Sequence, residues 1–347
     1  MHTNQETIKA YVSAVSSYLP KATLTNGQLA EEFPEWSVEK IYEKTGINNR
    51  YIAEEYDTCS GMAVSAAKNL FAKYNISAEE IDYILLCTQS PDHLLPTTAC
   101  IVQNELGIPT SVGALDFNLG CSGYVYGLSL AKALIESLQA KKVLLLTSEL
   151  YSRYINKNDK SVRTLFGDAA TATLVEGKCS NKDLIHSFKF GTDGSGANNL
   201  IVPHGGSKKP ITNGSHIEAE DKSGNKRSPC NLFMDGAEIL TFTLKTVPKS
   251  IASVLKSANL DSAQVDRVIF HQANKFMLDK LRKKTGFTEE QFLLSYKDYG
   301  NTVSSTIPLG IEKAISDNQL KQDDKLLVCG FGVGYSWAGC VIEWTEC

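Results

Sequence analysis

Three side chains in this sequence combine chemical reactivity with an unusual local setting: a cysteine, a histidine and an asparagine. Cys121 stands in FNLGCSGYVYGL, between two glycines and ahead of an apolar run at helical spacing. His271 follows the apolar run VDRVIF, and Asn301 follows a glycine in DYGNTVSSTIPLG. A thiol, an imidazole and an amide together suit acyl transfer through a thioester, because they supply a nucleophile, a proton carrier and a donor for an oxyanion or enolate.

Each of these residues also has an ordinary structural interpretation. Buried cysteines are usually inert, a histidine at a strand end is more often structural, and an asparagine after glycine is typical of a turn. Four other cysteines lie in apolar runs and fit the inert class: Cys87, Cys100, Cys329 and Cys340. If Cys121 begins a helix, the helix dipole is expected to lower the pKa of its thiol.

An internal repeat favours the catalytic interpretation. SAEEIDYILLCTQS and SAQVDRVIFHQAN share a pattern in which Asp82 and Asp266 are 184 positions apart. KKVLLLTSE and DKLLVCGFG repeat at an offset of 183, measured from Lys142 to Lys325. Between these blocks, the glycine-containing turns with Cys121 and Asn301 repeat at an offset of about 181 and each leads into an amphipathic helix. Repeats in the same order at nearly constant spacing indicate a duplicated unit.

The repeated strands are short and apolar on both faces, which is typical of an α/β sheet covered by helices. We therefore predict two related halves, residues 1–178 with the cysteine and residues 179–347 with the histidine and asparagine. Residues 205–229 are rich in Gly, Ser, Lys and Asp and are expected to form an exposed insertion in the second half. In α/β sheets, ligands meet the carboxyl ends of strands. If the halves pack about a pseudo-two-fold axis, the three reactive residues meet at one central site.

Composition excludes several other classes of function. The chain has 347 residues, a net charge of -4, 42% hydrophobic and 21% charged residues, which fits a globular protein without a nucleic-acid footprint. No apolar run is long enough to span a membrane, and the start lacks a secretory leader, so a cytoplasmic location is expected. Nine scattered cysteines and six histidines form no CxxC or HxxxH pair, and no dinucleotide or ATP motif occurs. We expect no metal and no cofactor.

A glycine-rich segment, GFGVGYSWAG at residues 330–339, precedes the final apolar run CVIEWTE. It can be a tight hairpin before the last strand. It can also direct backbone N–H groups at a developing oxyanion. The two interpretations are compatible.

The four motifs NLGCSGYVYGL, HQAN, YGNTVSSTIPLG and GFGVGYSW, together with FGDAATATLVE from Phe166, resemble those of β-ketoacyl-acyl carrier protein synthase III and its relatives. The resemblance is collinear from about Ala10 to Trp344. It implies the duplicated thiolase fold, with five layers in which helices lie between and outside two sheets. It also implies a homodimer that acts on acyl-CoA and an acyl carrier protein.

The resemblance implies a role for each motif residue. Cys121 would take an acyl group from a thioester, and His271 and Asn301 would help to decarboxylate a malonyl thioester and stabilise its enolate. The backbone N–H groups of Cys121 and Val333 would form the oxyanion hole, and Leu95 would reach the acyl pocket of the dimer partner. The residues expected to bind substrate are Trp36, Lys44, Phe166, Met234, Gly236, Asn274, Lys275 and Gly332.

The chain departs from the family pattern around the substrate entrance. Lys44 stands where relatives have an Arg before Thr-Gly, Phe276 replaces an Arg after HQAN, and Leu95 stands where Phe is common. Val333 replaces the middle glycine of the closing loop. These changes leave open a synthase-like enzyme that makes an ester or amide without condensation. A catalytically silent scaffold for another synthase is a further alternative, although such subunits usually lose the nucleophile.

Overall fold

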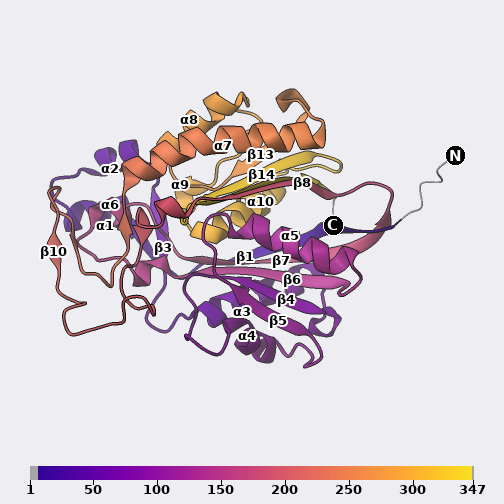
Figure 1. Cartoon of the computed structure of the whole chain (residues 1–347), viewed down its shortest axis with the longest axis horizontal. Coiled ribbons are helices and arrows are strands. Elements are labelled where there is room, and N and C mark those ends of the chain that lie inside the picture. The colour runs from indigo at the N-terminus through magenta and orange to yellow at the C-terminus, as the bar shows by residue number, and fades with distance from the viewer. Residues whose placement is uncertain (1–6, 346–347) are drawn as a thin grey trace.

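Two mixed β-sheets form the centre of the molecule in the computed structural model, which describes residues 7–345 (Figure 1). The N-terminal sheet has the strand order β1-β7-β6-β4-β5. Its outer pair is antiparallel, whereas β6, β4 and β5 run parallel. The strands are β1 (Thr7–Tyr18), β7 (Ala169–Ser180), β6 (Lys142–Glu149), β4 (Tyr83–Cys87) and β5 (Gly113–Phe117).

The C-terminal sheet repeats this order. Its strands are arranged β8-β15-β14-β13, and a parallel bridge from Val268 to Phe292 stands where β5 lies in the first sheet. The strands are β8 (Ile185–Thr192), β15 (Ser336–Glu343), β14 (Lys325–Gly332) and β13 (Arg267–Phe270). The predicted duplicated α/β fold is confirmed, because antiparallel and parallel pairings occur in the same sequence in each sheet.

Helices form three layers around the two sheets (Figure 1). The outer layer on the N-terminal sheet consists of α3 (Cys59–Tyr74) and α4 (Thr98–Leu106). The outer layer on the C-terminal sheet consists of α7 (Gly236–Ala258) and α8 (Lys275–Thr285). Between the sheets lie α5 (Gly123–Glu136) and α10 (Thr306–Ser316), which contact strands of both sheets. The result is the five-layer arrangement predicted from the family resemblance.

Local sequence fixes where these helices start and stop. Thr58 caps α3 by accepting the N–H of Gly61, and Asp235 caps α7 by accepting the N–H groups of Ala237 and Glu238. In contrast, Ser122 at the start of α5 makes no side-chain cap hydrogen bond. Because α5 is packed between two sheets, it needs apolar residues on more than one side, as its run of Tyr, Val, Leu and Ala provides.

The remaining elements lie mainly around the ends of the sheets. They are β2 (Ala22–Thr25), α1 (Asn26–Glu32), α2 (Val38–Thr45), β3 (Asn49–Ile52), η1 (Ala78–Glu80), η2 (Tyr151–Arg153), α6 (Lys160–Arg163), η3 (Gly194–Gly196), β9 (Leu200–Ile201), β10 (Ala219–Glu220), β11 (Lys226–Arg227), β12 (Phe233–Met234), η4 (Ser262–Gln264), α9 (Tyr296–Tyr299) and η5 (Val303–Ser305).

The expected insertion contains the two-residue hairpin strands β10 and β11. Arg227 in this hairpin pairs with Asp159, whose carboxylate is fully buried at the start of α6. We propose the junction of the two halves between β7, which ends at Ser180, and β8, which begins at Ile185. The ends of the predicted halves, residues 1–6 and 346–347, lie outside the described residues.

The glycine-rich segment 330–339 forms a tight hairpin between the last two strands, as one of its two interpretations predicted. β14 continues to Gly332 and β15 begins at Ser336, which leaves three residues for the turn. Glycines in this segment allow close packing: a Cβ at Gly332 would lie 2.7 Å from the sulfur of Cys121. Within residues 7–345, no helix is both long and apolar enough to cross a membrane.

Candidate active site

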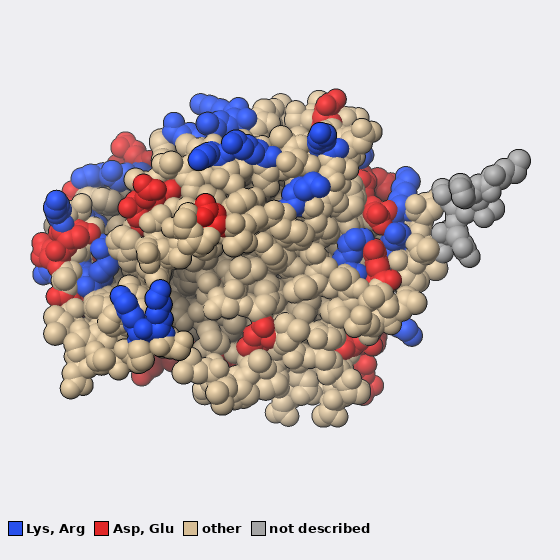
Figure 2. Space-filling model, in the orientation of Figure 1, with Lys and Arg blue, Asp and Glu red and all other residues tan. Residues whose placement is uncertain are grey.

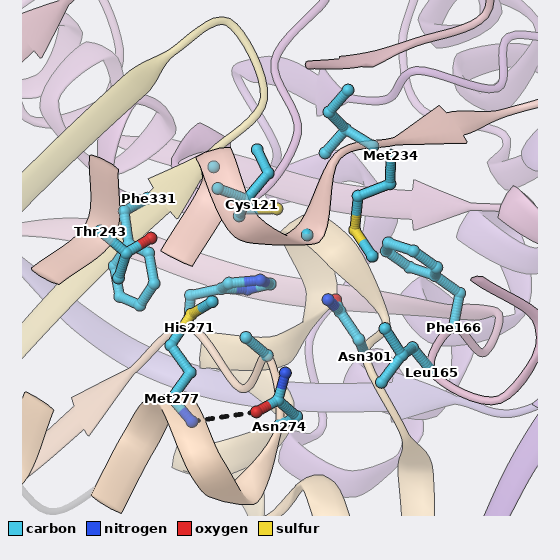
Figure 3. A pocket seen from close by; sticks show the side chains of 15 residues that line it. Cys121, Leu165, Phe166, Met234, Thr243, His271, Asn274, Met277, Asn301 and Phe331 are labelled. Carbon is cyan, nitrogen blue, oxygen red and sulfur yellow. Dashed lines mark hydrogen bonds between the residues drawn. The ribbon is translucent and has the colours of Figure 1, made fainter. Parts of the chain in front are cut away.

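The three reactive residues named from the sequence line one cavity (Figure 3), whose wall also includes Gly236, the first residue of α7. Its volume is about 70 Å³. The wall is largely apolar, with a few polar side chains. The lining residues are Cys121, Leu165, Phe166, Leu200, Met234, Gly236, Ile239, Thr243, His271, Ala273, Asn274, Met277, Asn301, Phe331 and Gly332.

Cys121 lies two residues before α5 and is only 4% exposed. The backbone N–H groups of Val333 and of Cys121 itself point at its sulfur. Burial nevertheless raises the pKa of the Cys121 thiol to about 12, and these two N–H groups offset the rise only in part. The expectation of a lowered pKa is therefore wrong for the unliganded site, because the loss of water outweighs the helix terminus.

His271 follows β13 and is held by the turn before α10. Its Nδ1 lies 2.8 Å from the hydroxyl of Thr306, and that hydroxyl donates to the carbonyl of Val303 at 3.0 Å. Since the Thr306 proton is used in this way, its oxygen accepts from Nδ1–H, which leaves Nε2 as the unprotonated ring nitrogen. Burial lowers the pKa of His271 to about 3, so the ring is neutral at ordinary pH.

Hydrogen bonds to the backbone and to the side-chain oxygen of Asn301 fix the position of this residue. Its N–H donates to the carbonyl of Leu165 at 2.9 Å, and its carbonyl accepts from Gly167 at 3.0 Å. The side-chain Oδ1 accepts from the N–H of Val303 at 3.0 Å. Because the amide oxygen is engaged, the NH₂ group is the end available to the cavity, where Figure 3 shows it. The site thus has an oriented neutral donor.

The two glycines beside Cys121 allow close packing of neighbouring side chains. A Cβ at Gly123 would collide with the sulfur of Cys87. A Cβ at Gly120 would lie 2.6 Å from the side chains of Gln89 and Val333. Neighbouring side chains fill the space at both positions, so these glycines serve the packing of the protein rather than the substrate.

A buried carboxyl that was not predicted from the sequence lies near Cys121. Glu149 ends β6 and is fully buried; one oxygen accepts from the hydroxyl of Ser304 at 2.6 Å and the other from the N–H of Gln89 at 3.1 Å. Burial raises the pKa of Glu149 to about 8. This carboxyl joins the strand end of the first half to the turn that follows Asn301. A Glu at the end of an apolar strand, LLLTSE, was the available signal.

The predicted substrate-binding residues fall into two groups. The first group lines the cavity: Phe166, Met234, Gly236, Asn274 and Gly332. Five other residues named from the sequence do not line it: Trp36, Lys44, Leu95, Lys275 and Val333.

The residues of the second group have contacts and exposure of their own. Trp36 lies between Lys40 and Lys44, whose ammonium groups are each 5.4 Å from the ring centre. Lys275 begins α8, directly after Asn274, and packs against Gly46 at the end of α2. Leu95 is 83% exposed.

Several cavity residues were not predicted, although part of the signal is in the sequence. Ile239 and Thr243 follow the predicted Gly236 on α7 at intervals of three and four residues, the spacing of one helix face. Thr306, which orients His271, has no such signal, because its role depends on the turn that precedes α10. Leu165, Leu200, Ala273, Met277 and Phe331 complete the wall.

Comparison with known proteins identifies the family. Models for 3-oxoacyl-[acyl-carrier-protein] synthase III match residues 115–194, and for its C-terminal part residues 255–344. A β-ketoacyl-[acyl-carrier-protein] synthase III of Caldanaerobacter subterraneus is 34% identical over 98% of this chain and 99% of its own. The chain belongs to the β-ketoacyl-[acyl-carrier-protein] synthase III family. The predicted family, and with it a condensing acyltransferase, is confirmed.

Other members of the synthase III family agree in sequence and structure. The Lactococcus lactis enzyme is 35% identical over 96% of this chain and 99% of its own. A crystal structure of a 3-oxoacyl-(acyl-carrier-protein) synthase III is 48% identical, with a TM-score of 0.96 over 97% of this chain and 100% of that one. The Burkholderia xenovorans structure is 39% identical, with a TM-score of 0.89 over 98% and 95%.

The Glu149 environment predicts a pH-dependent stability. With its pKa raised to about 8 from 4.5, folded Glu149 keeps a proton that the unfolded chain releases. Its contribution to the free energy of unfolding therefore falls as pH rises through this interval. For Glu149→Gln, we expect stability relative to wild type to increase between about pH 5 and pH 8.5, measured by urea denaturation. A difference that stays constant across this range would contradict the assignment.

Proposed function

We propose that this synthase takes an acyl group from acyl-CoA onto Cys121 and then condenses it with a malonyl thioester to give a 3-oxoacyl thioester. The observation that supports the proposal is that three polar groups able to react with or bind a substrate line one cavity. The thiol of Cys121, the Nε2 of His271 and the NH₂ of Asn301 belong to the same wall, and their other hydrogen-bonding atoms are engaged by the protein.

The neutral site requires the thiol proton to move during acylation. Because burial disfavours a free thiolate, Cys121 attacks the thioester carbonyl while Nε2 of His271 accepts its proton. The oxygen of the tetrahedral intermediate meets the N–H groups of Cys121 and Val333, which already converge beside the sulfur. The thiolate of CoA then leaves and takes the proton from His271. The products are acyl-Cys121 and CoA.

Condensation uses the donors on the other side of the cavity. Loss of carbon dioxide from the malonyl thioester leaves an enolate, whose oxygen accepts from the NH₂ of Asn301. Thr306 suits a second role for His271, since a rotated hydroxyl donates to Nδ1 and the ring then presents Nε2–H to the enolate. The enolate carbon attacks acyl-Cys121, the carbon–sulfur bond breaks, and the released thiolate takes up a proton supplied by the solvent, which its high pKa favours.

The cavity favours a short primer. Its volume of about 70 Å³ is well below the roughly 300–1,000 Å³ of typical ligand pockets. Opposite His271, the wall consists of bulky apolar side chains, among them Leu165, Phe166 and Met234 (Figure 3). We therefore expect acyl groups of a few carbons, and expect long straight chains to be excluded.

A basic surface supports an acidic carrier protein as a partner. Lysines and arginines gather along the part of the molecule formed by α7 and α8 (Figure 2). On α8, Lys280, Lys283 and Lys284 are exposed, and the helix begins at the cavity residue Asn274. A carrier that docks here would place its thioester arm near the cavity mouth.

An edge strand and nearby exposed apolar residues support a homodimer. β5 ends its sheet in the described part of the chain, and Leu130 on the adjoining helix α5 is 42% exposed. The loop after β4 presents Leu94 and Leu95 at 94% and 83% exposure. Pairing of β5 with the same strand of a second copy would cover these surfaces, and Leu95 would then be free to approach the partner's cavity.

Loss of the nucleophile is the first test. Cys121→Ala should abolish the mass increase seen when the wild-type enzyme is incubated with acetyl-, propionyl- and isobutyryl-CoA, measured by intact-protein mass spectrometry. Cys100→Ala removes an exposed cysteine and should leave acylation intact. A wild-type chain that gains no acyl mass from any of these thioesters would overturn the proposed function.

Removal of the Asn301 amide separates the two half-reactions. Asn301→Ala should slow carbon dioxide release from a malonyl thioester about 100- to 1,000-fold, the usual effect of losing one oxyanion donor. Acylation of Cys121 should change by no more than a few-fold, since its oxyanion hole is elsewhere. Labelled malonyl-CoA and trapped carbon dioxide provide the measurement. Competent acylation of wild type without any carbon dioxide release would favour transfer to an oxygen or nitrogen acceptor instead.

Charge reversal on α8 tests carrier docking. The triple change Lys280→Glu, Lys283→Glu and Lys284→Glu should raise the KM for a malonyl carrier protein about tenfold or more, since each desolvated or steering charge contributes up to a few kcal/mol. The kcat/KM for the small malonyl-N-acetylcysteamine thioester should stay unchanged. Lys222→Glu, an exposed lysine in the insertion, is the matched control. Equal losses with both thioesters would argue against docking at α8.

A further inference from the structure

Thr243 presents a buried hydroxyl for which the protein provides no partner. It lies on α7, is fully buried, and its Oγ1 makes no hydrogen bond within the described chain. A buried hydroxyl left unpaired costs about 1–3 kcal/mol, so native structures seldom keep one without a use. A threonine in a helix usually satisfies this group with the carbonyl four residues earlier, and here it does not.

The position of this hydroxyl relates it to the cavity. Thr243 is one of the lining residues, on the same helix face as Gly236 and Ile239. Figure 3 shows its oxygen directed toward the space between Cys121 and His271, next to the ring of Phe331. The exposure along this face falls from an exposed Gly236 to 8% at Ile239 and 0% at Thr243. α7 therefore forms a wall that runs from the mouth of the cavity to the reacting groups.

The cavity wall is mostly apolar. Leu165, Phe166 and Met234 form a side that fits a hydrocarbon acyl group. On the opposite side, among apolar side chains such as Phe331 and Met277, Thr243 on α7 and Asn274 at the start of α8 are the polar groups. A substrate that enters between these helices passes Thr243 and Asn274. The thioesters of the proposed reaction carry an amide in the arm next to the sulfur.

We propose that the Thr243 hydroxyl hydrogen-bonds an amide of the thioester arm and so makes Thr243 a specificity-determining residue that selects amide-bearing thioesters over simple alkyl thioesters. This inference rests on the proposed acyl transfer to Cys121. Binding of the arm gives the hydroxyl the partner that the free protein lacks. An alkyl arm of equal length leaves it unpaired, so the enzyme loses the interaction that the amide provides.

The test pairs the isosteric substitution Thr243→Val with two thioesters. S-acetyl-N-acetylcysteamine has the arm amide, and S-pentyl thioacetate has an alkyl arm of the same length. The second-order rate constant for acetylation of Cys121 is measured by intact-protein mass spectrometry. We expect Thr243→Val to slow acetylation by S-acetyl-N-acetylcysteamine and by acetyl-CoA about five- to tenfold, the effect of one hydrogen bond of about 1 kcal/mol. Acetylation by S-pentyl thioacetate should be unchanged or faster, and Thr243→Ser should restore the preference.

Ser250→Ala is the matched control for stability. Ser250 lies on the same helix and has a buried hydroxyl without a partner, but it does not line the cavity. Thr243→Val and Ser250→Ala should each leave the melting temperature unchanged or raise it, whereas only Thr243→Val should alter the preference between thioesters.

Three results would overturn the inference: equal effects of Thr243→Val on both thioesters, no effect on either, or a preference that shifts with Ser250→Ala as well. A melting temperature that falls with Thr243→Val while both rates drop together would mean a purely structural role. If wild type is acetylated by none of the three thioesters, the proposed function itself fails.

Discussion

Exclusion of water from the space between the two halves is the constraint on which this site depends. It raises the pKa of Cys121 to about 12 and lowers that of His271 to about 3, so that each group is held in its neutral form. Neither residue is charged before substrate arrives, and the chemistry must couple bond formation to proton movement. The same exclusion strengthens every hydrogen bond that orients the site, because these bonds have little competition from solvent.

A side-chain hydroxyl and a backbone N–H make the hydrogen bonds that orient His271 and Asn301. A hydroxyl on Thr306 sets the tautomer of His271, and a backbone N–H of Val303 sets the direction of the Asn301 amide. Val303 lies in η5 and Thr306 is the first residue of α10, and Ser304 ties this segment to the buried carboxyl of Glu149. The orientation of His271 and Asn301 therefore depends on one short segment and its anchor in the opposite sheet.

The sequence predicted the reactive residues, the duplication and the family because these depend on residue type and on spacing along the chain. It could not predict the pKa of Cys121, since that value reflects how completely the sheets close over the sulfur. It indicated the hairpin at residues 330–339 but not that Gly332 in this hairpin packs directly against the sulfur of Cys121. Glu149 and Thr306 were missed because their partners are far away in the chain.

Equivalent positions in the two halves of the fold have different surroundings. α5 and α10 begin 183 residues apart, not about 181 as the sequence indicated, so Cys121 corresponds to Ser304 rather than to Asn301, and Asn301 corresponds to Asn118. β4 and β13 begin 184 residues apart, which matches Cys87 with His271. Each counterpart is committed to holding structure: Ser304 binds Glu149, Asn118 accepts from Gln89, and Cys87 donates to the carbonyl of Leu119. One member of each pair lines the cavity, and the other makes a hydrogen bond within the protein. Two copies of one unit thus form a single, asymmetric cavity.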